Sequence, residues 1–126
     1  MSKDFFVETP VSVRARERLR EDQFLDESFR DLKYNPEKRQ DYTAPSGELD
    51  VEEVYKSLGT DYEKGNLIFR CVELNLTEAE VRALIEHRHR RCYSGWPDAD
   101  KRPDLKRIYI SWCREFGVEP DPNFKL

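Results

Sequence analysis

The sequence contains no apolar run that could cross a membrane. A spanning helix needs about 20 mainly apolar residues, and charged side chains interrupt every apolar stretch here well before that length. The first ten residues, MSKDFFVETP, also lack the basic-then-apolar order of a secretory signal peptide. We therefore expect a soluble, intracellular (cytoplasmic) protein with no membrane partner.

Cysteine is scarce as well. The chain has three cysteines, Cys71, Cys92 and Cys113. An odd number in an intracellular context indicates reduced thiols and argues against a disulfide framework. Cysteines with apolar neighbours are expected to behave as small core residues.

The sequence also lacks the motifs of most enzyme active sites. It has no glycine-rich phosphate loop, and no serine or cysteine stands in a known nucleophile motif. Glu86 is the one carboxylate close in sequence that could orient either histidine. We therefore expect a noncatalytic protein without a cofactor and assign no catalytic residues.

His87, His89 and Cys92 resemble a metal cluster only in linear order. Residues two apart on a helix point about 200° from each other, so the two histidines cannot face one ion. His89 and Cys92 share a face, but a tetrahedral zinc site would need two further ligands at suitable spacing. We expect no metal site.

Charge is what the sequence has in abundance. Charged residues make up 38% of 126 residues, and the net charge is -4. A chain of this length forms one domain with a modest core. From Arg82 to Arg107, however, eight Lys or Arg stand against four Asp or Glu. Such an asymmetry marks either a solvated surface or a basic binding face.

The first part of the chain, residues 1–49, combines runs of charge with scattered aromatic residues. Thr9 before Pro10 is an acceptable helix start, so a helix is expected within 10–33. Proline and glycine turn signals predict an irregular linker over 34–49. We expect residues 1–49 to be a long, partly extended N-terminal arm.

From Asp50 onward the helix-start signals repeat. Asp50, Thr60 and Thr77 each precede a glutamate by three positions, which is the spacing of a capping box. Gly59 and Gly117 are the matching stop signals. We expect a compact module over residues 50–118 with helices at about 51–58, 61–74, 78–92 and 104–116, followed by a C-terminal tail, 119–126.

The run 61–74 is ambiguous, because its β-branched and aromatic residues also suit a strand. Aligning Cys71 with Cys113 places Asn75 over Gly117, and asparagine is the next best residue for the left-handed conformation after a helix. This weak internal similarity favours a helix. We therefore predict an all-α fold, a small bundle of about four short helices with the N-terminal arm attached.

The arm has too many apolar residues for an inert tail and too few for a core of its own. Our hypothesis is that it orders on a larger partner, which would make the protein a noncatalytic adaptor, assembly factor or small structural subunit of a multiprotein complex. The expected partner-binding anchors are Phe5, Phe6, Phe24, Phe29, Tyr34 and Trp96.

The alternative is a helix-turn-helix-like domain that binds nucleic acid through the basic segment 82–107. The short connection between the second and third helices suits that motif. Against it, Glu78 and Glu80 lie where such folds read DNA, and the chain is acidic as a whole. The contact residues would be Arg88, Arg90, Arg91, Lys101, Arg102, Lys106 and Arg107.

Overall fold

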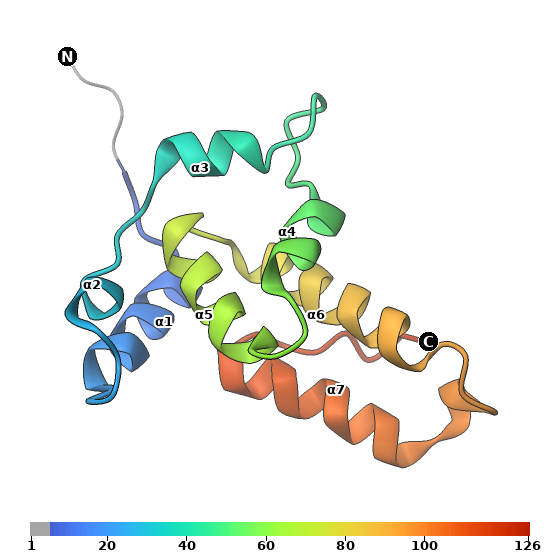
Figure 1. Cartoon of the computed structure of the whole chain (residues 1–126). Helices are drawn as coiled ribbons and strands as arrows, with labels where there is room; N and C mark the ends of the chain where they lie inside the picture. Colours follow the sequence, from blue (N-terminus) through green and yellow to red (C-terminus); the bar gives the residue numbers. More distant parts are fainter. Residues whose placement is uncertain (1–5) are drawn as a thin grey trace.

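The computed structural model describes residues 6–126. Helices account for all the regular structure in this part of the chain, apart from one isolated bridge between Thr43 and Leu49. The seven α-helices and one 3-10 turn (Figure 1) are α1 (Pro10–Glu21), α2 (Glu27–Arg30), α3 (Pro36–Asp41), α4 (Val51–Leu58), α5 (Glu63–Glu73), α6 (Glu78–Tyr93), η1 (Ala99–Lys101) and α7 (Pro103–Phe116).

The all-α class is therefore confirmed, and α4 to α7 match the four expected helices closely. The expectation of about four helices is wrong, because α1, α2 and α3 precede them. The description of a partly extended arm is not matched well, because α1 and α2 both lie within 10–33, where one helix was expected, and α3 lies within the expected linker 34–49. None of the helices within residues 6–126 has the length and apolarity that a bilayer crossing requires.

Two of the three expected capping signals act at helix starts. Asp50 accepts a hydrogen bond from the Glu53 amide (3.2 Å), and Thr77 with Glu80 forms a complete capping box. The helix start predicted at Thr60 is wrong, because α5 begins at Glu63 without a side-chain cap. The Tyr62 ring takes the space beside Gly65, where a Cβ would lie 2.5 Å from Tyr62 Cδ1. This packing explains a glycine inside the first turns of α5.

The ends of α5 and α7 have the same geometry, as their sequence similarity suggests. Asn75 (φ 47°) and Gly117 (φ 70°) both adopt the left-handed conformation. The next amide bonds back to the carbonyl five residues earlier in each case, from Leu76 to Cys71 (3.2 Å) and from Val118 to Cys113 (3.0 Å). This is the Schellman motif, and it buries the apolar residue that follows each helix.

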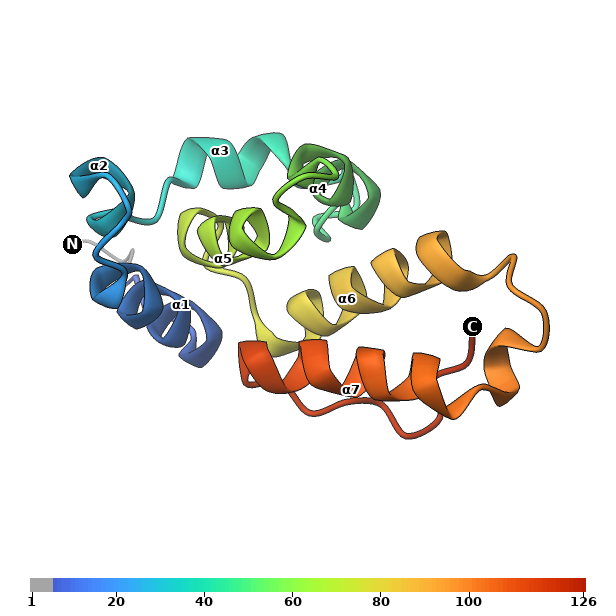
Figure 2. The ribbon, with the colours of Figure 1, turned by 60° about the horizontal axis from the view of Figure 1, so that its bottom comes forward.

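Residues of the N-terminal part enter the core directly. Val11, Ala15 and Leu19 on α1 are buried in one cluster with side chains of α4 to α7. Figure 2 shows α1 beside the end of α7, and α6 antiparallel to α7. The arm thus covers the core and helps to form it.

Two ion pairs hold α3 onto the same core. Lys38 Nζ lies 2.8 Å from Glu73 Oε2, and the Arg39 guanidinium binds both carboxylate oxygens of Glu80 (3.0 and 2.7 Å). Burial raises the pKa of Glu80, but the hydrogen bonds from Arg39 and Thr77 and the charge of Arg39 together outweigh it, so the pKa lies below its usual value. The stretch expected as an irregular linker therefore contains a helix that is fixed at both α5 and α6.

Candidate functional site

Exposed aromatic side chains gather at the end of the molecule formed by α1 and α2. Phe6 stacks on Tyr34 with ring centroids 4.7 Å apart, and Phe29 stacks on Phe69 at 4.8 Å. Phe24 contacts almost nothing, since 99% of it is exposed. Phe5, the remaining anchor expected here, lies outside the described residues. Four of the expected anchors therefore belong to this end.

Phe24 stands on a fixed turn that connects α1 to α2. Its amide donates to Asp22 Oδ1 (2.9 Å), and the Leu25 amide donates to the Asp22 carbonyl oxygen (3.4 Å). Leu25 packs against the core. Because the neighbouring Leu25 points toward the core, the phenyl ring of Phe24 is held in solvent.

Acidic residues precede and follow Phe24 in the sequence. The 21–31 segment contains five exposed acidic residues and a single cation, Arg30. Within residues 6–126, none of the five carboxylates has an ion-pair partner; they are Glu21, Asp22, Asp26, Glu27 and Asp31. The 21–31 segment is thus an acidic surface with aromatic residues at its centre.

Trp96 lies apart from the other expected anchors. The connection between α6 and α7 is at the end of the molecule opposite α1 and α2 (Figures 1 and 2). There the Trp96 ring packs edge-on against Tyr93 at 5.1 Å, and the Arg102 guanidinium lies 5.0 Å from its centroid. It remains 44% exposed. The structure therefore divides the expected anchors between two remote surfaces.

The seven basic residues considered for nucleic-acid contact differ in their exposure and in their partners within the chain. Arg88 is mostly buried, paired with Glu63 (3.2 Å) and lying 4.1 Å from the Trp112 centroid. Arg102 pairs with Asp104 at 2.7 Å. Arg90 covers the Phe124 ring at 4.7 Å. Exposed side chains without an ion-pair partner among the described residues are Arg90, Arg91, Lys101, Lys106 and Arg107.

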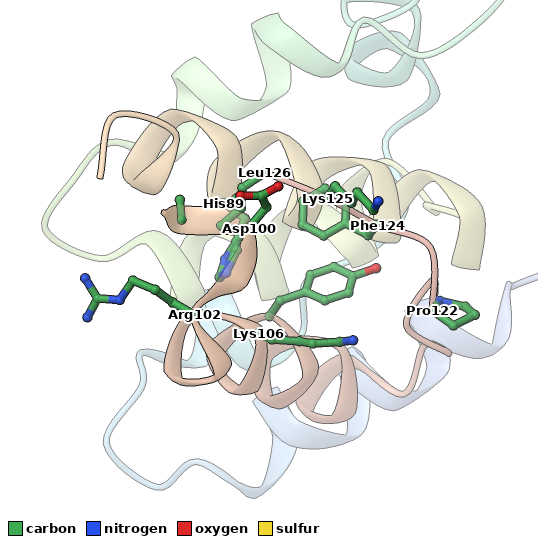
Figure 3. A pocket seen from close by; sticks show the side chains of 10 residues that line it. His89, Asp100, Arg102, Lys106, Pro122, Phe124, Lys125 and Leu126 are labelled. Carbon is green, nitrogen blue, oxygen red and sulfur yellow. The ribbon is translucent and has the colours of Figure 1, made fainter. Parts of the chain in front are cut away.

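A small cavity lies where α6, η1, α7 and the C-terminal residues meet. Its volume is about 110 Å³, and Figure 3 shows that His89, Lys106 and Phe124 are among the side chains that line it. Burial lowers the pKa of His89, and this effect exceeds the opposing one of a contact between Nε2 and the Leu105 carbonyl oxygen (2.8 Å). The imidazole is therefore neutral at pH 7.

The cysteines and His87 were weighed as possible functional groups, and the buried cysteines have the environment of ordinary core residues. Burial raises the pKa of the Cys113 thiol to about 11 and raises the pKa of Cys71 as well. A thiol that stays protonated at neutral pH is a poor nucleophile. His87 packs edge-on against Tyr55 at 5.0 Å, and Cys92 is exposed. Across residues 6–126, no group of three or more His, Cys, Asp or Glu residues is placed to hold a metal ion.

Sequence reasoning missed a basic groove between α1 and α7. Its volume is about 700 Å³, and it is lined by Arg14, Arg107, Ile110, Ser111, Arg114 and Glu115. The α7 side of the groove was predictable from the sequence, because helical spacing places four residues on one face opposite the apolar stripe: Arg107, Ile110, Ser111 and Arg114. The contribution of Arg14 was not available, because it depends on how α1 docks.

Comparison of the chain with protein-family models, with curated proteins and with solved structures gives no match. Function is therefore inferred from these surfaces alone.

Proposed function

We propose that this protein is a noncatalytic protein-binding module, acting as an adaptor, assembly factor or small subunit of a larger complex. It contacts its partner through the 21–31 segment and the aromatic residues beside it. The observation that carries the proposal is the 99% exposure of Phe24 on a hydrogen-bonded turn. Burying a phenylalanine side chain is worth about 1.5–3 kcal/mol, and this ring gains none of that in the isolated chain.

Further exposed apolar side chains lie on the N-terminal part of the chain that carries Phe24. Six large hydrophobic side chains are exposed among the described residues, and four of them are Phe6, Val7, Phe24 and Phe29. Residues 6–49 are already folded on the core, so binding requires only that exposed side chains be covered. An anchor held in place by its own turn loses little conformational entropy on binding.

The charges define the partner's chemistry. Five carboxylates without an ion-pair partner within residues 6–126 flank Phe24 in the sequence, so we expect a complementary surface with an apolar pocket and basic residues beside it. Such complementarity speeds association and makes it sensitive to salt.

Nucleic-acid binding through segment 82–107 has weaker support. Arg88 and Arg102 have partners within the chain, and the N-terminal turn of α6 carries Glu78 and Glu80. A helix-turn-helix reader uses that turn to contact base edges, where two carboxylates would repel phosphates.

A pull-down from source cells with the tagged full chain tests the proposed function. We expect Phe24→Ala to reduce partner recovery by at least about tenfold, as for a central hot-spot residue. The midpoint of thermal unfolding should not change, because the ring makes no core contact. Tyr62→Ala is the matched control, since it removes another exposed aromatic ring on a different surface. Equal recovery of the same proteins by wild type and Phe24→Ala would contradict the proposal.

A further inference from the structure

The basic groove between α1 and α7 has an apolar floor and a rim of arginines. Ile110 lies between Arg107 and Arg114, which are two helical turns apart, or about 10 Å along the axis. Arg14 closes the other side, where its Nε donates to the Glu115 carbonyl oxygen (3.1 Å). The one carboxylate there, Glu115, is paired with Lys64 at 2.8 Å.

These arginines leave the groove positively charged. Within residues 6–126, none of Arg14, Arg107 and Arg114 has a carboxylate partner. Guanidinium groups bind carboxylates in a two-pronged geometry and also stack on aromatic rings. A suitable ligand is therefore an acidic segment that presents an aromatic or aliphatic side chain to Ile110.

The 21–31 segment has this chemistry. It carries the exposed Phe24, with carboxylates before and after it in sequence that have no ion-pair partner within residues 6–126. Within one molecule the Phe24 ring extends into solvent from the turn that follows α1, while Leu25 and Phe29 of the same segment pack inward. The groove is basic and the 21–31 segment is acidic. Each also offers an exposed or partly exposed apolar side chain, Ile110 in the groove and Phe24 in the segment.

We propose that the groove binds the 21–31 segment of a second copy of this chain. The inference rests on the proposed function, because it names the partner of that same segment. Both features belong to one end of the molecule, since Arg14 lies on α1 and the segment begins where α1 ends at Glu21. In a two-fold pair each copy would place its 21–31 segment in the other copy's groove.

Sedimentation velocity of the full chain over a wide concentration range, at low and high salt, tests this inference. We expect a monomer–dimer equilibrium that high salt weakens, because the contact is charged. Glu21→Lys with Asp26→Lys changes the segment, and Arg107→Glu with Arg114→Glu changes the groove. All four side chains are exposed, and circular dichroism confirms that each double variant remains folded.

Each double variant alone should dimerise at least tenfold more weakly than wild type. An equimolar mixture of the two should regain a dimer, because the unchanged groove of the first meets the unchanged segment of the second. The control, Lys56→Glu with Lys101→Glu, alters net charge as much as the groove variant does but lies outside both features. It should dimerise like wild type.

A wild-type chain that stays monomeric at low salt overturns the inference, as does a mixture of the two variants that remains monomeric. A dimer that neither double variant weakens also overturns it, since another surface then forms the contact. These results leave the proposed function intact if Phe24→Ala still loses a different partner in the pull-down. If that partner is also retained, both proposals fail.

Discussion

His89 occupies a position on α6 where 1% of its surface is exposed. A carbonyl oxygen only accepts hydrogen bonds, so the contact with Leu105 places the ring proton on Nε2. Tyr93, Tyr109 and Phe124 surround the imidazole with centroid distances of 4.8, 5.7 and 6.1 Å. The residue acts as a neutral packing element with one directed hydrogen bond.

The lowered pKa of His89 makes stability depend on pH. An unfolded histidine titrates near pH 6.5, so below that pH the unfolded chain binds a proton that the native state does not. Stability should fall as pH drops from about 6.5 toward the pKa of the folded state, by at most about 1.4 kcal/mol for each pH unit. Denaturant unfolding at neutral and mildly acidic pH measures it.

His89→Gln should remove this part of the pH dependence, since an amide can still donate to Leu105 but does not titrate. His87→Gln is the matched control, because it removes the other histidine of the chain and should leave the His89 contribution in place. A profile that His89→Gln leaves unchanged between pH 7 and 5 would show that His89 does not cause the dependence.

The turn between α5 and α6 joins three elements. Asn75 Oδ1 accepts from the Thr9 amide (2.9 Å), and its Nδ2 donates to the Val7 carbonyl oxygen (3.0 Å). Thr9 Oγ1 in turn donates to the Leu76 carbonyl oxygen (2.6 Å). The same asparagine that ends α5 in the left-handed conformation therefore fixes the chain at the start of α1.

Substitutions at Asn75 separate these two roles. Asn75→Gly keeps the left-handed turn and removes the side-chain bonds, so we expect a loss of about 1 kcal/mol in the free energy of unfolding. Asn75→Ala also strains the turn and should lose about 2 kcal/mol or more. Denaturant unfolding measures both, and hydrogen exchange at the Thr9 amide should speed up in each variant. If Asn75→Gly keeps the wild-type free energy of unfolding and the wild-type exchange rate at the Thr9 amide, the Asn75 side chain does not fix the start of α1.

At the scale of the whole molecule, a single core draws on both halves of the sequence. Val11 and Ala15 line the same crevice as Ile68 and Phe116, and Leu49 and Leu19 belong to the same buried cluster. Burial of the α1 side chains is worth about 5 kcal/mol, which is comparable to the entire stability of many small domains. The division into a 1–49 arm and a 50–118 module stays a prediction.

A chain that begins at Gly47 tests that division. We expect it to lose cooperative thermal unfolding or to aggregate, because removal of α1 uncovers Ile68 and Phe116. Circular dichroism melting of this chain beside the full-length protein measures the effect. A sharp transition at the wild-type midpoint would show that residues 47–126 fold independently.

The helix boundaries of the second half were predictable because they depend on local spacing. Thr77 and Glu80 form their capping box within one turn, and Gly117 reaches the left-handed conformation because it has no Cβ. The helix start predicted at Thr60 is wrong, since α5 begins at Glu63 and has no side-chain cap. A capping pattern in the sequence therefore does not by itself determine where a helix begins.

From the sequence, one could predict which residue types form the candidate surfaces but not where those residues lie. The sequence marks Phe24 and Trp96 as unusual, but it cannot place them at opposite ends of the molecule. Nor can it show that Arg88 is enclosed between Glu63 and Trp112, or that Arg107 pairs with no carboxylate within residues 6–126. These properties arise from contacts between residues far apart in the chain.

By itself, the sequence determined the all-α class, the positions of α4 to α7 and the matching ends of α5 and α7, because hydrogen bonds over three to five residues set them. The tertiary structure alone decided that the N-terminal residues complete the core, and which charged and aromatic side chains remain exposed. Burial depends on long-range packing, which covers one side chain of a local pattern and leaves its neighbour in solvent.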